Sequence, residues 1–117
     1  MTDLIACLST GKGTWLEVSR LMKAADWAHI YLIAPKFSME KFTHDKKFAF
    51  IEINPDGEIE DMKKAVVEQL KNKLDIETAI SIVSGSGKEH MAVISATMSL
   101  GVGIRLVSLK NNNMVEI

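Results

Sequence analysis

The feature that most constrains the fold is a series of short apolar runs separated by stretches with helical periodicity. The runs lie at 4–8, 30–34, 48–53, 80–83 and 104–109. The runs at 4–8, 30–34 and 80–83 are mostly apolar, which is typical of buried strands. Between them, apolar residues recur every three or four positions, and this spacing predicts helices at about 14–25, 59–74 and 88–100.

Strands that alternate with helices predict an α/β fold, here a doubly wound, Rossmann-like sheet in a three-layer α/β/α arrangement. We expect one domain over residues 1–117, with five mainly parallel strands in the order 3-2-1-4-5 and helices on both faces. After an asparagine turn at 111–113, residues 114–117 are expected to return as a short antiparallel edge strand. Residues 36–47 are harder to interpret and predict one or two helical turns followed by a polar, exposed loop.

Composition narrows the possible partners. A net charge of -1 over 117 residues gives no support for binding to duplex nucleic acid. No apolar run approaches the roughly 18 residues of a membrane span, and the N-terminus has no signal-peptide pattern, so we expect a cytoplasmic protein without a membrane partner.

The single cysteine, Cys7, lies in an apolar run, which indicates a buried thiol in a reducing compartment rather than a nucleophile. Histidine, cysteine and carboxylate residues do not cluster, so no metal site and no cofactor is predicted.

Two glycine turns follow the first and fourth predicted strands. Their residues are Ser9, Thr10, Gly11, Lys12, Gly13 and Thr14 in the first turn, and Ser84, Gly85, Ser86, Gly87 and Lys88 in the second. In the strand order 3-2-1-4-5 these strands are neighbours at the point where the winding reverses, and ligands bind at that point in such sheets. Small side chains let backbone N–H groups approach an anion, and hydroxyls and ammonium groups add to the attraction.

We therefore predict that both turns form one rim that binds a phosphate-bearing ligand. Lys12 and Lys88 would neutralise phosphate, while Thr10 and Ser86 would donate hydroxyl hydrogen bonds. The alternative is that the glycines only turn the corners of a doubly wound fold.

Neither turn matches a nucleotide-binding fingerprint. The dinucleotide motif needs a third glycine where this chain has Leu16 after the first turn and His90 after the second. A P-loop would need glycine in place of Ile82 and a serine or threonine in place of Glu89. NAD binding and P-loop ATPase activity are therefore not predicted.

Three residues beside the turns have more specific interpretations. His90, in the first turn of its helix, is a candidate general acid or base next to a bound phosphate, or else a hydrogen-bonded surface histidine. Trp15 is expected in the core rather than stacked on a base. Thr14 has capping-box spacing to Glu17, which predicts that Thr14 caps the first helix.

The predicted helix at 88–100 is apolar or small on nearly all sides. Its residues able to face water are Glu89, His90, Ser95, Thr97 and Ser99. A helix on an open sheet normally keeps one solvated side. We expect the outer side of this helix to pack on the same helix of a second chain across a two-fold axis, or to be buried under a neighbouring helix.

With these turns, the sequence resembles the CRISPR-associated Rossmann fold (CARF) domains, the sensor modules of cyclic oligoadenylate signalling. The resemblance rests on the run from Ser9 to Gly13 and on the run from Ser84 through Lys88 into a helix of small residues. It implies a homodimer whose paired rims form one ligand cradle, and in some members ring-nuclease activity. The chain departs from the family in the Gly85-Ser86-Gly87 run, where a Gly-Gly-Thr-like run is usual, and we expect no fused effector domain.

The sequence thus predicts a protein that binds a phosphate-bearing small molecule or a cyclic oligonucleotide. Any catalysis would be cleavage of a phosphodiester, with His90 as the candidate acid or base. One alternative is a non-enzymatic interaction subunit that docks a partner through the helix at 88–100. Another is an enzyme that acts on a small phosphorylated metabolite at the same rim.

Overall fold

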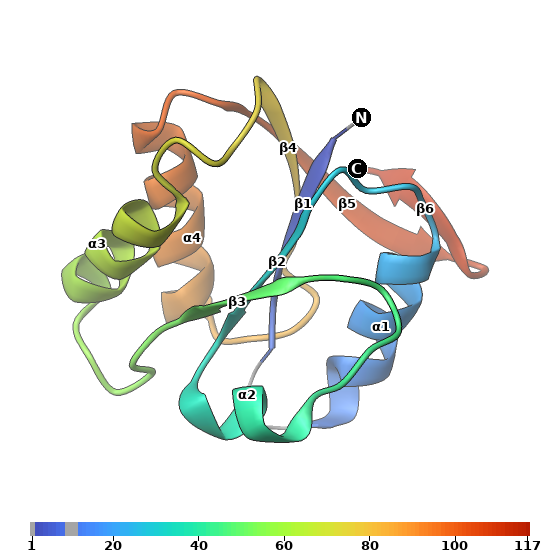
Figure 1. Ribbon diagram of the computed structural model, residues 1–117, viewed down its shortest axis with the longest axis horizontal. Coiled ribbons are helices and arrows are strands. Elements are labelled where there is room, and N and C mark those ends of the chain that lie inside the picture. The colour runs from blue at the N-terminus through green and yellow to red at the C-terminus, as the bar shows by residue number, and fades with distance from the viewer. Residues whose placement is uncertain (1, 9–11) are drawn as a thin grey trace.

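A six-stranded sheet runs through the middle of the molecule in the computed structural model, which describes residues 2–8 and 12–117 (Figure 1). The elements in chain order are β1 (Asp3–Cys7), a 3-10 turn η1 (Lys12–Thr14), α1 (Trp15–Lys23), β2 (Ile30–Ala34), α2 (Lys36–Lys41), β3 (Ala49–Glu52), α3 (Ile59–Leu70), β4 (Glu77–Ser81), α4 (Gly87–Ser99), β5 (Gly103–Lys110) and β6 (Asn113–Glu116).

The strands lie in the order β3-β2-β1-β4-β5-β6. The first five are parallel, and β6 pairs antiparallel with β5. In the central register, Leu4 of β1 lies between Ile30 of β2 and Ala79 of β4. The predicted α/β class and the predicted neighbours of β1 are confirmed, and the sixth strand is the expected C-terminal edge strand.

Helices cover both faces of the sheet, so the fold has three layers (Figure 1). Because side chains alternate along a strand, β1 contributes to two separate cores. Leu4 and Ala6 pack on the face covered by α1 and α2, whereas Ile5 and Cys7 pack on the face covered by α3 and α4. Buried strands with apolar residues on both sides are what the continuous apolar runs predict.

The fourth strand differs from its predicted bounds of 80–83. It begins at Glu77 and ends at Ser81, because Thr78 pairs with Asp3 of β1 and Ile80 pairs with Leu106 of β5. Hydrogen bonding along both neighbours therefore decides the register, not the apolar run alone. The run continues past the strand into the loop that leads to α4.

The start of α1 also differs from its prediction. The Thr14 side chain makes no capping hydrogen bond, and the 3-10 turn precedes the α-helix. Trp15 packs edge-to-face on Phe42 with ring centroids 5.9 Å apart, which confirms its place in the core. The polar loop after α2 is fastened to the end of α1, since the Lys46 ammonium donates to the carbonyl oxygen of Ala25 at 2.8 Å.

The last two strands form a tight hairpin. Asn111 and Asn112 both have positive φ, 53° and 63°, as a two-residue type I′ turn requires. Arg105 of β5 donates to the carboxylates of Glu77 and Glu116 at 2.9–3.1 Å, and so joins three adjacent strands. In the described part of the chain, none of the helices has the length and apolar character that a membrane crossing needs.

Candidate functional site

The ends of β1 and β4 lie side by side at the carboxyl edge of the sheet. Ala6 and Ser81 are paired in the parallel register, so the chain leaves both strands at neighbouring positions. The loop after β4 folds back over the end of β1. A Cβ atom at Gly85, whose φ is +100°, would lie 3.0 Å from the Cβ atom of Cys7. The second predicted turn therefore contacts the strand from which the first predicted turn leaves.

Of the first turn, the structure describes only the last part. Ser9, Thr10 and Gly11 lie outside the described residues, and of Lys12 the backbone alone is described, as the start of η1. Gly13 and Thr14 complete that 3-10 turn.

Ser86 caps α4 and forms a reciprocal capping box with Glu89. The N–H of Glu89 donates to the Ser86 hydroxyl at 3.2 Å, and the N–H of Ser86 donates to Glu89 Oε1 at 2.7 Å. The capping box predicted at Thr14 does not form. The same spacing, a serine or threonine three residues before a glutamate, forms a capping box at Ser86 and Glu89 instead. The box leaves the N–H groups of Gly87 and Lys88 as first-turn donors without a partner among the described residues.

The sequence interpretation missed the structural role of Glu89 at this turn. Glu89 was expected to face water, but it is only 5% exposed, and its carboxylate lies between Gly85 and Ser86. The spacing from Ser86 to Glu89 was the signal that would have located it. A buried carboxylate behind the loop would repel an anion, so any anion at this turn would have to approach from the side away from Glu89.

His90 holds the loop after β4 in place. Its Nε2 donates to the carbonyl oxygen of Ser84 at 2.8 Å, and Nε2 lies 3.1 Å from the position of a Gly85 Cβ atom. Nε2 therefore carries a hydrogen, and the neutral ring has its lone pair on Nδ1. Any acid–base chemistry at a bound ligand would run through Nδ1.

Among the residues that the structure describes, nothing requires glycine at positions 13 and 87. Neither has the positive φ that favours glycine, and a Cβ atom at either position would meet no described atom within 4 Å. Gly85 differs, because its φ and its three close neighbours exclude a side chain. Glycine at 13 and 87 leaves space in front of the backbone on the outer side of the two turns.

Two hydroxyls on β4 are buried without a hydrogen-bond partner among the described residues. They belong to Thr78 and to Ser81, which is 1% exposed at the last position of the strand. Ser81 alternates with Ile80 and so lies on the sheet face covered by α1. The sequence interpretation missed both hydroxyls. It placed Thr78 outside the predicted strand at 80–83 and took Ser81 as part of a continuous apolar run.

Cys7 lies directly under the Gly85 loop. Burial, with the nearby Glu89 carboxylate as a second cause, raises the pKa of the Cys7 thiol to about 12. The thiol is therefore protonated at neutral pH, in agreement with the expected buried, unreactive cysteine.

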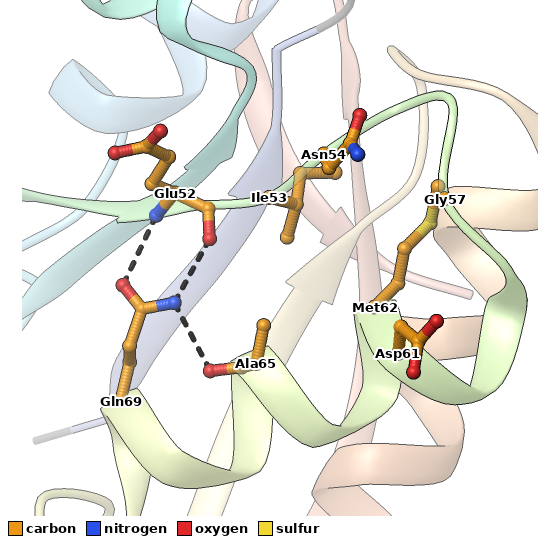
Figure 2. Close-up of a pocket in the computed structure, with 8 residues that line it drawn as sticks. All are labelled: Glu52, Ile53, Asn54, Gly57, Asp61, Met62, Ala65 and Gln69. Atoms are coloured by element: carbon orange, nitrogen blue, oxygen red, sulfur yellow. Dashed lines mark hydrogen bonds between the residues drawn. The ribbon is translucent and has the colours of Figure 1, made fainter.

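A separate pocket of about 410 Å³ lies at the carboxyl end of β3, against α3 (Figure 2). Its ionisable lining residues are Glu52 and Asp61, and no lysine or arginine lines it. The Gln69 carboxamide, which lines the pocket, forms two hydrogen bonds with the backbone of Glu52. It donates to the Glu52 carbonyl oxygen at 2.9 Å and accepts from the Glu52 N–H at 3.1 Å (Figure 2). Because two carboxylates repel an anion, this pocket is unsuited to a phosphate-bearing ligand.

The outer side of α4 carries exposed methionines. Met91 is 60% and Met98 is 67% exposed, whereas Val93 and Ala96 pack in the core against the sheet. Helix α3 packs against α4, yet it does not cover the two methionine side chains. Burial under a neighbouring helix, one of the two expected arrangements, thus accounts for only part of the helix surface.

Strand order, layer arrangement and the two adjacent strand ends define a Rossmann-like, doubly wound α/β protein. No protein-family model and no curated protein matches the sequence.

Proposed function

We propose that this protein binds a phosphate-bearing ligand, either a nucleotide or a cyclic oligoadenylate, on the outer side of the turns at Gly13 and Gly87. The observation that carries the proposal is a pair of glycines that neither their backbone conformation nor their packing against the described residues requires. Glycine at such positions lets a ligand approach the backbone closely. The resemblance to CARF domains supports the cyclic oligoadenylate in particular.

The first turn of α4 supplies the anion-binding groups in this proposal. The N–H groups of Gly87 and Lys88, which have no partner among the described residues, lie at the start of the helix, where the helix dipole attracts negative charge. The Lys88 ammonium adds charge from the same turn, and Lys12 would add charge from the loop after β1. The residues of the first turn from Ser9 to Thr14 would close the site from the β1 side.

Cleavage of a bound ring would depend on positioning more than on acid–base chemistry. The attacking hydroxyl, the phosphorus and the leaving oxygen must lie in line, and the amides and lysines would stabilise the charge that develops on the phosphoryl oxygens. His90 would contribute through Nδ1, because its Nε2 is bound to Ser84. The lone buried Cys7 supports a location in a reducing compartment such as the cytoplasm.

Titration of the full chain tests the proposal with cyclic oligoadenylates, mononucleotides and phosphate as ligands. We expect Lys12→Ala/Lys88→Ala to weaken binding roughly tenfold or more, since charge-assisted hydrogen bonds are lost. Gly87→Ala should also weaken binding while it leaves the fold intact. Lys71→Ala/Lys73→Ala is the matched control, because these exposed lysines follow α3 at the opposite edge of the sheet.

Two outcomes would overturn the proposal: no binding of any probe by the wild type, or equal binding by the wild type and the Lys12/Lys88 variant. Turnover of a small phosphorylated metabolite with no response to oligonucleotides would indicate the metabolite enzyme instead.

The second candidate is an interaction subunit without enzymatic activity. The exposure of Met91 and Met98 on α4 favours it, because large apolar side chains on one helix side are typical of contact surfaces. Association that Met91→Lys/Met98→Lys abolishes, in a protein that binds no phosphate-bearing probe, would support this candidate.

A further inference from the structure

The two edge strands of the sheet, β3 and β6, differ in whether other parts of the chain hydrogen-bond to their outward backbone groups. At the β3 edge, Gln69 of α3 fills the place of a neighbouring strand, since its carboxamide both accepts from and donates to the backbone of Glu52 (Figure 2). A third hydrogen bond, to the carbonyl oxygen of Ala65 at 3.0 Å, fixes the carboxamide on α3. An incoming strand would have to displace this side chain, so the β3 edge is closed at Glu52.

At the other edge, the hairpin register fixes which backbone groups of β6 point away from the sheet. Lys110 pairs with Asn113 and Ser108 with Val115, and the N–H of Ile117 donates to the carbonyl oxygen of Leu106 at 2.9 Å. In an antiparallel ladder, hydrogen-bonded residues alternate with residues whose N–H and C=O groups point to the other side. Asn113, Val115 and Ile117 therefore face β5.

Met114 and Glu116 present their N–H and C=O groups outward. Within the described part of the chain, no side chain or backbone group occupies them. β6 is short, at four residues, and carries one charged side chain, but it contains no proline, no lysine and no bulge. Its middle residues, Met114 and Val115, are apolar.

We propose that β6 pairs antiparallel with β6 of a second copy of this chain, with the two-fold axis beside Val115. Met114 and Glu116 are two residues apart, so in antiparallel register Met114 of each copy lies opposite Glu116 of the other. Each such pair exchanges two hydrogen bonds, and all outward groups of both strands are satisfied. The same patch serves on both copies, as an isologous interface requires, and the two sheets become one.

The side chains at the junction suit a second copy. Val115 lies opposite Val115 of the second copy on the sheet face shared with α3 and α4, and Ile117, 79% exposed, flanks it. The Glu116 carboxylate would be the repulsive group, but Arg105 of the same chain binds it at 2.9 Å. Each copy thus brings a neutralised ion pair to the junction, and the two glutamates do not oppose association.

Two variants test the contact by light scattering on a size-exclusion column. Met114→Pro removes an outward N–H and keeps every β5–β6 hydrogen bond, since Met114 does not donate to β5. Val115→Lys sets two ammonium groups at the two-fold axis. We expect a wild-type dimer and an association about 10–100-fold weaker in each variant. The control is Met91→Lys/Met98→Lys on α4, which should remain a dimer.

A measurement on the unmodified protein keeps the test decisive if a variant fails to fold. Amide hydrogen exchange at Met114 and Glu116 should slow as protein concentration rises, while exchange at Gly57, in an exposed turn, should not change. A monomeric wild type at all concentrations would overturn the proposal. A dimer broken by the α4 variant and not by Val115→Lys would also overturn it, and would place the contact on α4.

Discussion

Replacement of Gly85 by alanine should be among the most damaging single-methyl additions in this protein. The residue has φ of +100°, a conformation that costs a residue with a Cβ about 1–2 kcal/mol. The new Cβ would also lie 3.0 Å from Cys7 Cβ, an atom fixed to the central strand, and would press on Glu89 and His90. Overpacking of this kind costs about 1–3 kcal/mol.

Together these effects predict that Gly85→Ala lowers the free energy of unfolding by about 2–5 kcal/mol. In a domain of this size, that corresponds to a fall in melting temperature on the order of 10–20 °C. Urea titration followed by circular dichroism gives the free energy, and calorimetry gives the melting temperature. Gly87→Ala is the matched control, because its Cβ meets nothing within 4 Å, and it should be neutral or stabilising by about 0.5 kcal/mol. A Gly85→Ala protein within about 1 kcal/mol of the wild type would refute the view that this loop is clamped against β1.

Three further predictions concern the two edges of the sheet and the buried cysteine. Gln69→Ala should lower the free energy of unfolding by about 1 kcal/mol in urea titration, because it removes the carboxamide that closes the β3 edge; an unchanged midpoint would contradict this. Hydrogen bonds from Arg105 lower the pKa of Glu116, so the stability from this pair is present above the ordinary glutamate pKa of 4.5 and is lost as pH falls through the lowered value. The melting temperatures of wild type and Glu116→Gln should therefore differ at pH 7 and converge on acidification, and a gap that stays constant to pH 3 would exclude the linkage. With its pKa raised to about 12, Cys7 should resist iodoacetamide at pH 8 in the native protein and react only in denaturant, as mass spectrometry can detect.

The fold was predictable because local and global signals agree along most of the chain. Alternating strands and helices determine the α/β class, and the continuous apolar run of β1 already implies a central strand, as its position between β2 and β4 confirms. The tight turn at Asn111 and Asn112 was likewise readable from residue type, because asparagine tolerates positive φ.

The site was less predictable, because its details depend on contacts between segments far apart in the sequence. Two capping-box patterns exist, and only the structure distinguishes Ser86, which forms the box, from Thr14, which does not. Burial of Glu89 follows from the loop folding over Cys7, which the helical pattern of α4 does not indicate. Thr97 was also expected to face water, but it is buried and donates to the carbonyl oxygen of Val93 at 2.8 Å, a local bond that lets a hydroxyl enter the core.

The unpartnered hydroxyls of β4 have a consequence for engineering. A buried hydroxyl without a partner costs the native state about 1–3 kcal/mol, so Ser81→Ala and Thr78→Val are expected to raise thermal resistance. Selection for thermal stability alone would favour alanine at position 81 and valine at position 78. Ser81 lies at the strand end nearest the proposed ligand. At this position we therefore expect stability and ligand binding to favour different residues.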